Sequence, residues 1–184
     1  MDAQCCCSLE LGILISLITF PGVVVHELAH QIFCIFCGLK VYKVKYFQLS
    51  NPNGYVVHES TDCSWKVFLT CMGPFFINSV LGMSILLPIS IDLMVFREYN
   101  NPLILLAGWL GFSILMHAFP SRGDAKVMIS RIIKNPKASQ LWKVIAAPFV
   151  ALIYICSIEK ILWLDLTYAA VLTVLATGFL IHIL

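Results

Sequence analysis

Charged side chains are scarce in this sequence. Asp, Glu, Lys and Arg make up 12% of its 184 residues and hydrophobic residues 60%, whereas charged residues are about 25% of a typical soluble domain. The mean hydropathy is +0.90. There is also no basic tract interleaved with aromatic residues, so nothing indicates a nucleic-acid partner. The composition therefore predicts an integral membrane protein and not a soluble domain.

Basic residues are missing from the first ten positions, and the polar lead there is too short for a cleavable signal peptide. We therefore expect the first apolar segment to remain in the protein as a membrane helix.

Three ionisable residues interrupt that first apolar segment. His26, Glu27 and His30 spell H-E-x-x-H within V-V-V-H-E-L-A-H-Q, residues 23–31. Two histidines four residues apart lie on one face of a helix, where both can bind one Zn²⁺, and in this pattern the glutamate is the general base. The alternative is a pair of core histidines satisfied by neighbouring helices, with Glu27 in a salt bridge. Ionisable side chains are costly to place in an apolar membrane segment, and these three stand in the order of a catalytic zinc motif. Both points favour the metal site.

A repeated cysteine pattern is lacking. Of eight cysteines, only Cys34 and Cys37 are spaced C-x-x-C, and a structural zinc site needs a second such pair or nearby histidines. Cys34 follows His30 by four residues, but a metal held by the motif lies too far along the helix axis for a zinc–sulfur bond of about 2.3 Å. We interpret both as buried apolar thiols. For the Cys5–Cys7 cluster two alternatives remain: acylation of the cysteines beside the membrane, or unmodified thiols.

Five apolar segments are long enough to be membrane helices, namely residues 11–36, 67–91, 103–119, 141–158 and 166–184. We expect Pro21-Gly22 to kink the first segment, and Gly73-Pro74 and Pro88 to break the second. The basic stretch 127–134 has the pattern of a short amphipathic helix at the interface.

Between the first two segments the pattern changes to that of strands. Residues 41–49 alternate around Lys43 and Lys45, residues 51–54 read Asn-Pro-Asn-Gly, and a second β-rich run follows. These features predict a β-hairpin within residues 41–59. Its edge is suited to take up an extended substrate by strand addition, and the alternative is a plain connector.

The predicted fold is thus a membrane all-α bundle of about five transmembrane helices with a small β-hairpin between the first and second. We expect a single integral membrane domain over residues 1–184. Its motif-bearing core spans residues 11–125, and additional transmembrane helices lie within 141–184.

Basic residues are unevenly distributed among the connections. With the N-terminus outside, connections 37–66 and 120–143 face the cytoplasm and hold ten lysines and arginines, whereas the outer connections hold two, Arg97 and Lys160. This is a strong positive-inside bias. The H-E-x-x-H motif is then expected within the membrane but closer to the cytoplasm.

A catalytic zinc ion needs a third protein ligand and an open position for water. Asp124 is the expected ligand, because it lies on the cytoplasmic side directly after an apolar segment and beside a helix-breaking proline and glycine. The alternative is a helix cap, since Ser121 and Asp124 are spaced as in a capping box. Four acidic residues expected on the outer side and one histidine near the C-terminus are less suitable: Asp92, Glu98, Glu159, Asp165 and His182.

At three places, in order, the chain resembles the site-2 protease type of intramembrane zinc metalloproteases. They are H-E-L-A-H at 26–30, Gly73-Pro74 followed by Asn78, and H-A-F-P-S-R-G-D from His117 to Asp124. The second element of that family usually reads G-P-x-x-N, and its third reads N-x-x-P followed by L-D-G. Here the asparagine comes one residue later, histidine replaces asparagine, and glycine precedes the aspartate, as in a divergent branch.

The resemblance implies a zinc metalloprotease that hydrolyses peptide bonds within or beside membrane-spanning segments. His26, His30 and Asp124 would hold Zn²⁺, and Glu27 would be the catalytic base. We expect His117 or Asn78 to help hold the oxyanion or the substrate. The resemblance also implies a β-structured segment where the hairpin 41–59 falls, so the expected partner is a membrane protein substrate at that hairpin edge.

Two other functions are compatible with the same residues. A zinc hydrolase of a lipid or a small amide would use the same three ligands and differ only in the shape of its cavity. A non-catalytic metal-binding scaffold would keep the metal ion and would not need Glu27.

Overall fold

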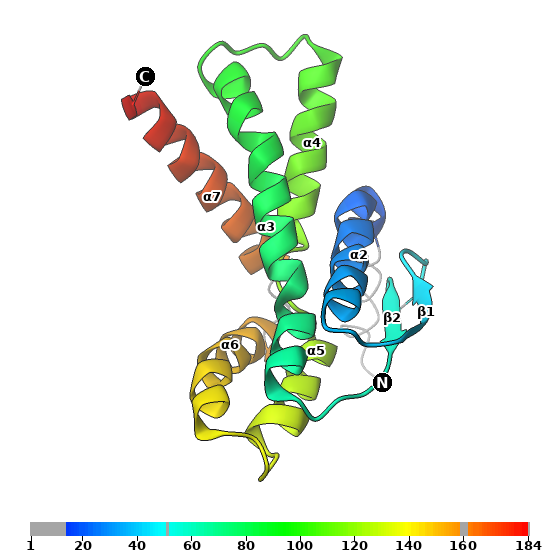
Figure 1. Cartoon of the computed structure of the whole chain (residues 1–184). Helices are drawn as coiled ribbons and strands as arrows, with labels where there is room; N and C mark the ends of the chain where they lie inside the picture. The colour runs from blue at the N-terminus through cyan, green and yellow to red at the C-terminus, as the bar shows by residue number, and fades with distance from the viewer. Residues whose placement is uncertain (1–13, 51, 159–161, 184) are drawn as a thin grey trace.

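The computed structural model describes residues 14–50, 52–158 and 162–183, and within them the protein is mostly helical with one small sheet (Figure 1). The elements, in order, are α2 (Phe20–Phe36), β1 (Val41–Lys45), β2 (Tyr55–His58), α3 (Ser64–Met94), α4 (Pro102–Met116), α5 (Arg122–Met128), the π-helix η1 (Ile129–Ile133), α6 (Gln140–Ile158) and α7 (Leu162–Ile183). The predicted helical character and the predicted hairpin are confirmed. The Cys5–Cys7 cluster, Glu159 and Lys160 lie outside the described residues.

Helix α2 carries the H-E-x-x-H motif. A turn at Thr19 separates it from the helical residues 14–18, so the predicted interruption occurs two residues before Pro21. Pro21 then occupies the first turn of α2, where its missing N–H has no helical partner to lose. The helix ends at Phe36, shortly before Gly38, whose φ of 66° is the left-handed conformation that glycine adopts freely.

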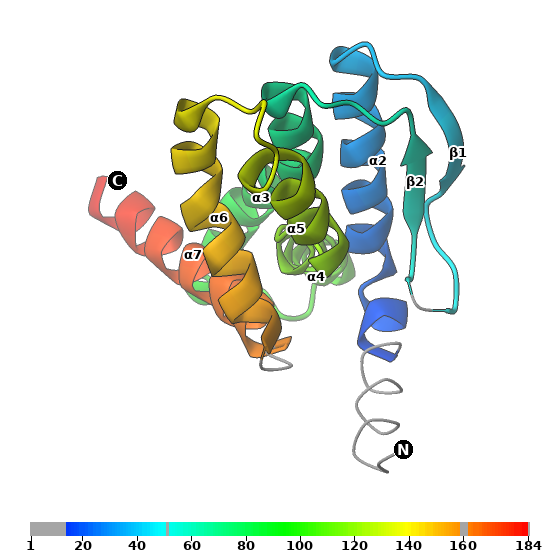
Figure 2. The same ribbon diagram turned by 90° about the horizontal axis from the view of Figure 1, so that it is seen from below.

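The two strands pair in antiparallel register, with Lys43 opposite Val57 and Lys45 opposite Tyr55. Strand β2 lies between β1 and helix α2 (Figure 2). The turn that joins the strands folds back on itself, because the Gln48 side chain donates to the carbonyl of Pro52 at 2.6 Å. The hairpin is therefore a wall beside α2 and not an extended connector.

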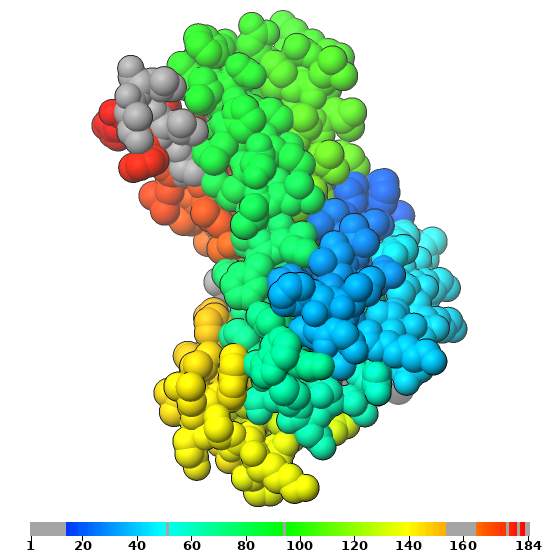
Figure 3. Space-filling model, in the orientation of Figure 1, coloured from blue at the N-terminus to red at the C-terminus, as the bar shows by residue number. Residues whose placement is uncertain are grey.

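Helix α3 runs through the whole molecule (Figure 3). The sequence predicted breaks at Gly73-Pro74 and at Pro88, but the helix continues through both positions for 31 residues. A proline removes one helical hydrogen bond, and a helix packed against its neighbours can tolerate that loss.

Helices α6 and α7 pack against different halves of α3 (Figure 1). Helix α6 shares a buried apolar cluster with α5, η1 and the first turns of α3, which includes Val67, Met128 and Ala146. Helix α7 contributes to a second cluster with the later turns of α3 and with α4, around Leu86 and Ala169. The two helices therefore pack against different parts of α3.

Among the helices of the described residues, only α3 is long and apolar enough to cross a membrane by itself. The apolar stretches of α2, α4, α6 and α7 are shorter. The expectation of about five transmembrane helices is therefore not supported. It rested on runs of apolar residues, and the turns at Thr19 and after Met116 end helices within such runs.

Candidate metal centre

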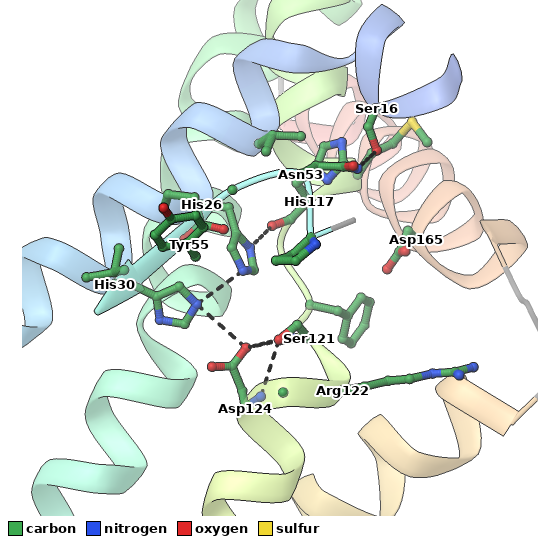
Figure 4. Close-up of a pocket in the computed structure, with 18 of the residues that line it drawn as sticks. Ser16, His26, His30, Asn53, Tyr55, His117, Ser121, Arg122, Asp124 and Asp165 are labelled. Carbon is green, nitrogen blue, oxygen red and sulfur yellow. Dashed lines mark hydrogen bonds and ion pairs between the residues drawn. The ribbon is translucent and has the colours of Figure 1, made fainter. Parts of the chain in front are cut away.

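The two histidines of α2 lie one helical turn apart and point to the same place (Figure 4). Their Nε2 atoms are 3.2 Å apart. Each Nδ1 atom is 2.8 Å from a backbone carbonyl oxygen, that of His117 for His26 and that of Thr70 for His30. A carbonyl only accepts hydrogen bonds, so each Nδ1 carries a proton, and in the neutral ring each Nε2 then has a lone pair to offer. This is the tautomer that an Nε2 metal ligand needs.

Asp124 forms the helix cap that the sequence offered as an alternative, and it also lies beside the two histidines. Its Oδ2 accepts a hydrogen bond from the backbone N–H of Ser121 at 2.8 Å, and its own backbone N–H donates to the Ser121 hydroxyl at 3.2 Å, which is a complete capping box at the start of α5. The Ser121 hydroxyl also donates to the same Oδ2 at 2.6 Å. The same oxygen lies 3.6 Å from Nε2 of His30.

The spacing of these three ligand atoms fits a metal ion. Two nitrogen lone pairs 3.2 Å apart repel each other unless a proton or a metal ion lies between them. Zinc bonds of about 2.0–2.1 Å in a tetrahedral site place ligand atoms about 3.3 Å apart, close to the 3.2 Å and 3.6 Å measured here. All three atoms lie within 4.8 Å of one another, so His26, His30 and Asp124 can hold a metal ion.

Glu27 is held beside this group by the hairpin. Its side chain is buried, with 8% of the residue exposed. Gly54, just before β2, packs directly on it, because a Cβ at position 54 would lie 2.6 Å from Cγ of Glu27. The sequence predicts only a turn at Asn53-Gly54. The structure adds that Gly54 leaves room for the carboxylate.

Asn78 of α3 lies behind the metal centre and is fully buried. Its Nδ2 donates to the backbone carbonyls of Gly22, Ile114 and His117 at 3.4, 3.2 and 2.9 Å. The His117 carbonyl is the one that also orients His26. Asn78 therefore ties α2, α3 and α4 together. The oxyanion or substrate role expected for Asn78 stays a prediction.

His117 lines the cavity in front of the metal centre. Its Nε2 lies 2.8 Å from the hydroxyl of Thr19, and that hydroxyl donates its proton to the carbonyl of Ile15 at 2.7 Å. Nε2 of His117 is therefore the donor, and Nδ1 of the neutral ring is left as an acceptor. In this tautomer His117 can accept a hydrogen bond through Nδ1. Its expected part in holding the oxyanion or the substrate stays a prediction.

One cavity of about 560 Å³ contains these groups. Its walls are α2, the hairpin with Asn53 of the turn and Tyr55 of β2, and the α4–α5 connection (Figure 4). Asp165 of α7 also lines the cavity. The charge distribution along the sequence predicts Asp165 on the outer side of the membrane and Asp124 on the cytoplasmic side, whereas the structure brings both residues to one cavity.

No family model, no curated protein and no solved structure matches the chain. The chemistry of the site itself is therefore the basis for a function.

Proposed function

We propose that this protein is a zinc-dependent intramembrane metalloprotease that hydrolyses peptide bonds within or beside the membrane-spanning segments of other proteins. The observation that carries the proposal is that Glu27 shares one cavity with the group of His26, His30 and Asp124. Metal-assisted hydrolysis of an amide needs such a carboxylate beside the metal site. Two nitrogen ligands and one oxygen ligand favour zinc over calcium or magnesium, which prefer oxygen ligands throughout.

Each residue has a distinct task in this proposal. His26, His30 and Asp124 would hold the zinc ion, which would supply Lewis acidity for the hydrolysis. Glu27 accepts the proton of the attacking water and then passes it to the leaving amine. His117 accepts a hydrogen bond from an N–H of the substrate. Ser121 holds the Asp124 carboxylate in place through its N–H and its hydroxyl.

The outer surface supports the membrane part of the proposal. Soluble monomers rarely expose large contiguous apolar patches, yet large apolar side chains on the outside of α2, α3, α4 and α7 are at least half exposed, among them Ile35, Phe36, Val80, Leu103, Val174 and Phe179. We propose that α3 crosses the bilayer, that α2, α4 and α7 lie alongside it, and that connections 37–66 and 120–143 face the cytoplasm.

The hairpin 41–59 supports a peptide as the substrate. Strand β2 pairs only with β1 in the described sheet, and Tyr55, Val56 and His58 line the cavity. A helical substrate must be unwound before hydrolysis, because its carbonyls are engaged in helical hydrogen bonds. The β2 edge offers replacement hydrogen bonds to the extended form and would lay it beside the metal centre.

Replacing Asp124 with alanine should remove the bound zinc. The alanine variant loses both the metal ligand and the helix cap, so Ser121→Ala serves as the matched control because it removes the cap hydroxyl and keeps the carboxylate. We expect Asp124→Ala to purify with little zinc, and Ser121→Ala to bind zinc about 10–100-fold more weakly than wild type. Metal analysis and zinc titration measure these results. Wild-type zinc content in Asp124→Ala would leave Asp124 only its cap role.

Asp165 should favour substrates that carry a lysine or arginine near the scissile bond. It faces the cavity, and no ion pair joins it to another described residue. A partly buried carboxylate without a countercharge attracts a cationic side chain. We expect Asp165→Asn to lower cleavage of lysine-containing substrates about tenfold and to leave their glutamine counterparts unchanged. Equal losses for both substrates would indicate a structural role instead.

A further inference from the structure

Helix α3 contains a proline one turn after Thr70. In a regular α-helix the N–H of residue 74 donates to the carbonyl of residue 70, but Pro74 has no N–H, and its ring pushes that carbonyl away from the helix axis. The Thr70 carbonyl is thus left without its helical partner. It accepts the Nδ1–H of His30 instead, at 2.8 Å.

The neighbouring Gly73 lets the two helices approach closely enough for this bond. A Cβ at position 73 would lie 2.5 Å from the ring of Phe33. Phe33 is one turn after His30 on α2, so the same close approach brings the His30 ring to the Thr70 carbonyl. Pro74 itself is fully buried at this contact.

We propose that Pro74 is a positioning residue of the metal centre, which frees the Thr70 carbonyl to fix the tautomer and the orientation of His30. The inference rests on the metal site of the proposed function but not on proteolysis. A carbonyl has two lone pairs and can accept two hydrogen bonds. With alanine at position 74, however, the helical N–H would draw the Thr70 carbonyl back along the helix axis and away from His30.

Pro88 provides a matched control in the same helix. It is also an internal proline of α3, but it is exposed and lies outside the lining of the cavity. Pro88→Ala restores a helical hydrogen bond as Pro74→Ala does, and it does so away from the metal centre. A difference between the two variants therefore reports the local effect on His30 and not the general effect of removing a proline.

The test is zinc affinity, measured by competition with a chromophoric chelator on detergent-solubilised protein. We expect Pro74→Ala to bind zinc at least tenfold more weakly than wild type, while Pro88→Ala binds it as wild type does. Pro74→Ala should unfold at no lower temperature than wild type, because alanine favours a helix interior. Wild-type affinity in Pro74→Ala, or equal weakening in both variants, would overturn the proposal.

A second measurement on wild-type protein does not depend on the folding of a variant. In ¹⁵N spectra of histidine-labelled, zinc-loaded protein, we expect the His30 ring to carry its proton on Nδ1. A proton on Nε2 of His30 would overturn the proposal. Neither readout depends on cleavage, so the positioning role can fail while the protease proposal stands, and the reverse also holds.

Discussion

Replacing Glu27 with glutamine is expected to abolish cleavage of a co-expressed membrane substrate while zinc stays bound. Glutamine has almost the same size as glutamate but cannot take up the proton, and general-base catalysis typically contributes about 10²–10⁴-fold. The metal-holding group does not include Glu27. We therefore expect cleavage to fall at least about 100-fold, measured as the ratio of product to intact substrate at equal amounts of enzyme.

The matched control for this variant is Glu98→Gln, because Glu98 is an exposed glutamate in the connection between α3 and α4. It should cleave at the wild-type rate. If Glu27→Gln also cleaved at that rate, the protease proposal would be wrong. Wild-type protein that bound zinc and hydrolysed a lipid amide but no peptide would favour the alternative hydrolase.

Replacing Gly22 with alanine is expected to separate α2 from α4 and to weaken the metal centre. A Cβ at position 22 would lie 2.0 Å from the backbone oxygen of Ser113, which cannot move aside as a side chain can. The Gly22 N–H also donates to the Ser113 hydroxyl at 3.0 Å, and the Gly22 carbonyl accepts from Asn78. Overpacking typically costs 1–3 kcal/mol, and we expect about 3 kcal/mol here because backbone must shift.

Gly178→Ala is the matched control, since a Cβ added to this helical glycine of α7 would meet no atom within 4 Å. It should be neutral or slightly stabilising, because alanine favours a helix by about 1 kcal/mol over glycine. Thermal unfolding and zinc content, both measured in detergent, distinguish the variants. A Gly22→Ala protein with the melting temperature and zinc content of wild type would contradict the close contact between α2 and α4.

The features that the sequence predicted correctly are local in the chain. His26 and His30 share a helix face because they are four residues apart, and the hairpin follows from alternation and turn residues within a short stretch. The Ser121–Asp124 capping box has the same local origin. The grouping of Asp124 with the two histidines was predicted over about a hundred residues, because few ligand types were available in an apolar chain.

The features that the sequence did not predict depend on how helices pack. Asp165 reaches the cavity because α6 and α7 occupy different halves of α3, and hydropathy does not report this arrangement. Asn78 donates hydrogen bonds to three backbone carbonyls. Every residue has such a carbonyl, so the sequence does not show which ones an asparagine will contact. Pro74 was expected to break the helix, whereas its consequence is a free carbonyl for His30.

The zinc content of purified wild-type protein, with Glu27→Gln measured beside it, tests the central claim most directly. A site made of His26, His30 and Asp124 predicts about one zinc ion per chain in both proteins. It also predicts that a chelator removes the zinc and that added zinc restores it. Protein that contains no zinc and does not take it up when zinc is supplied would contradict the account.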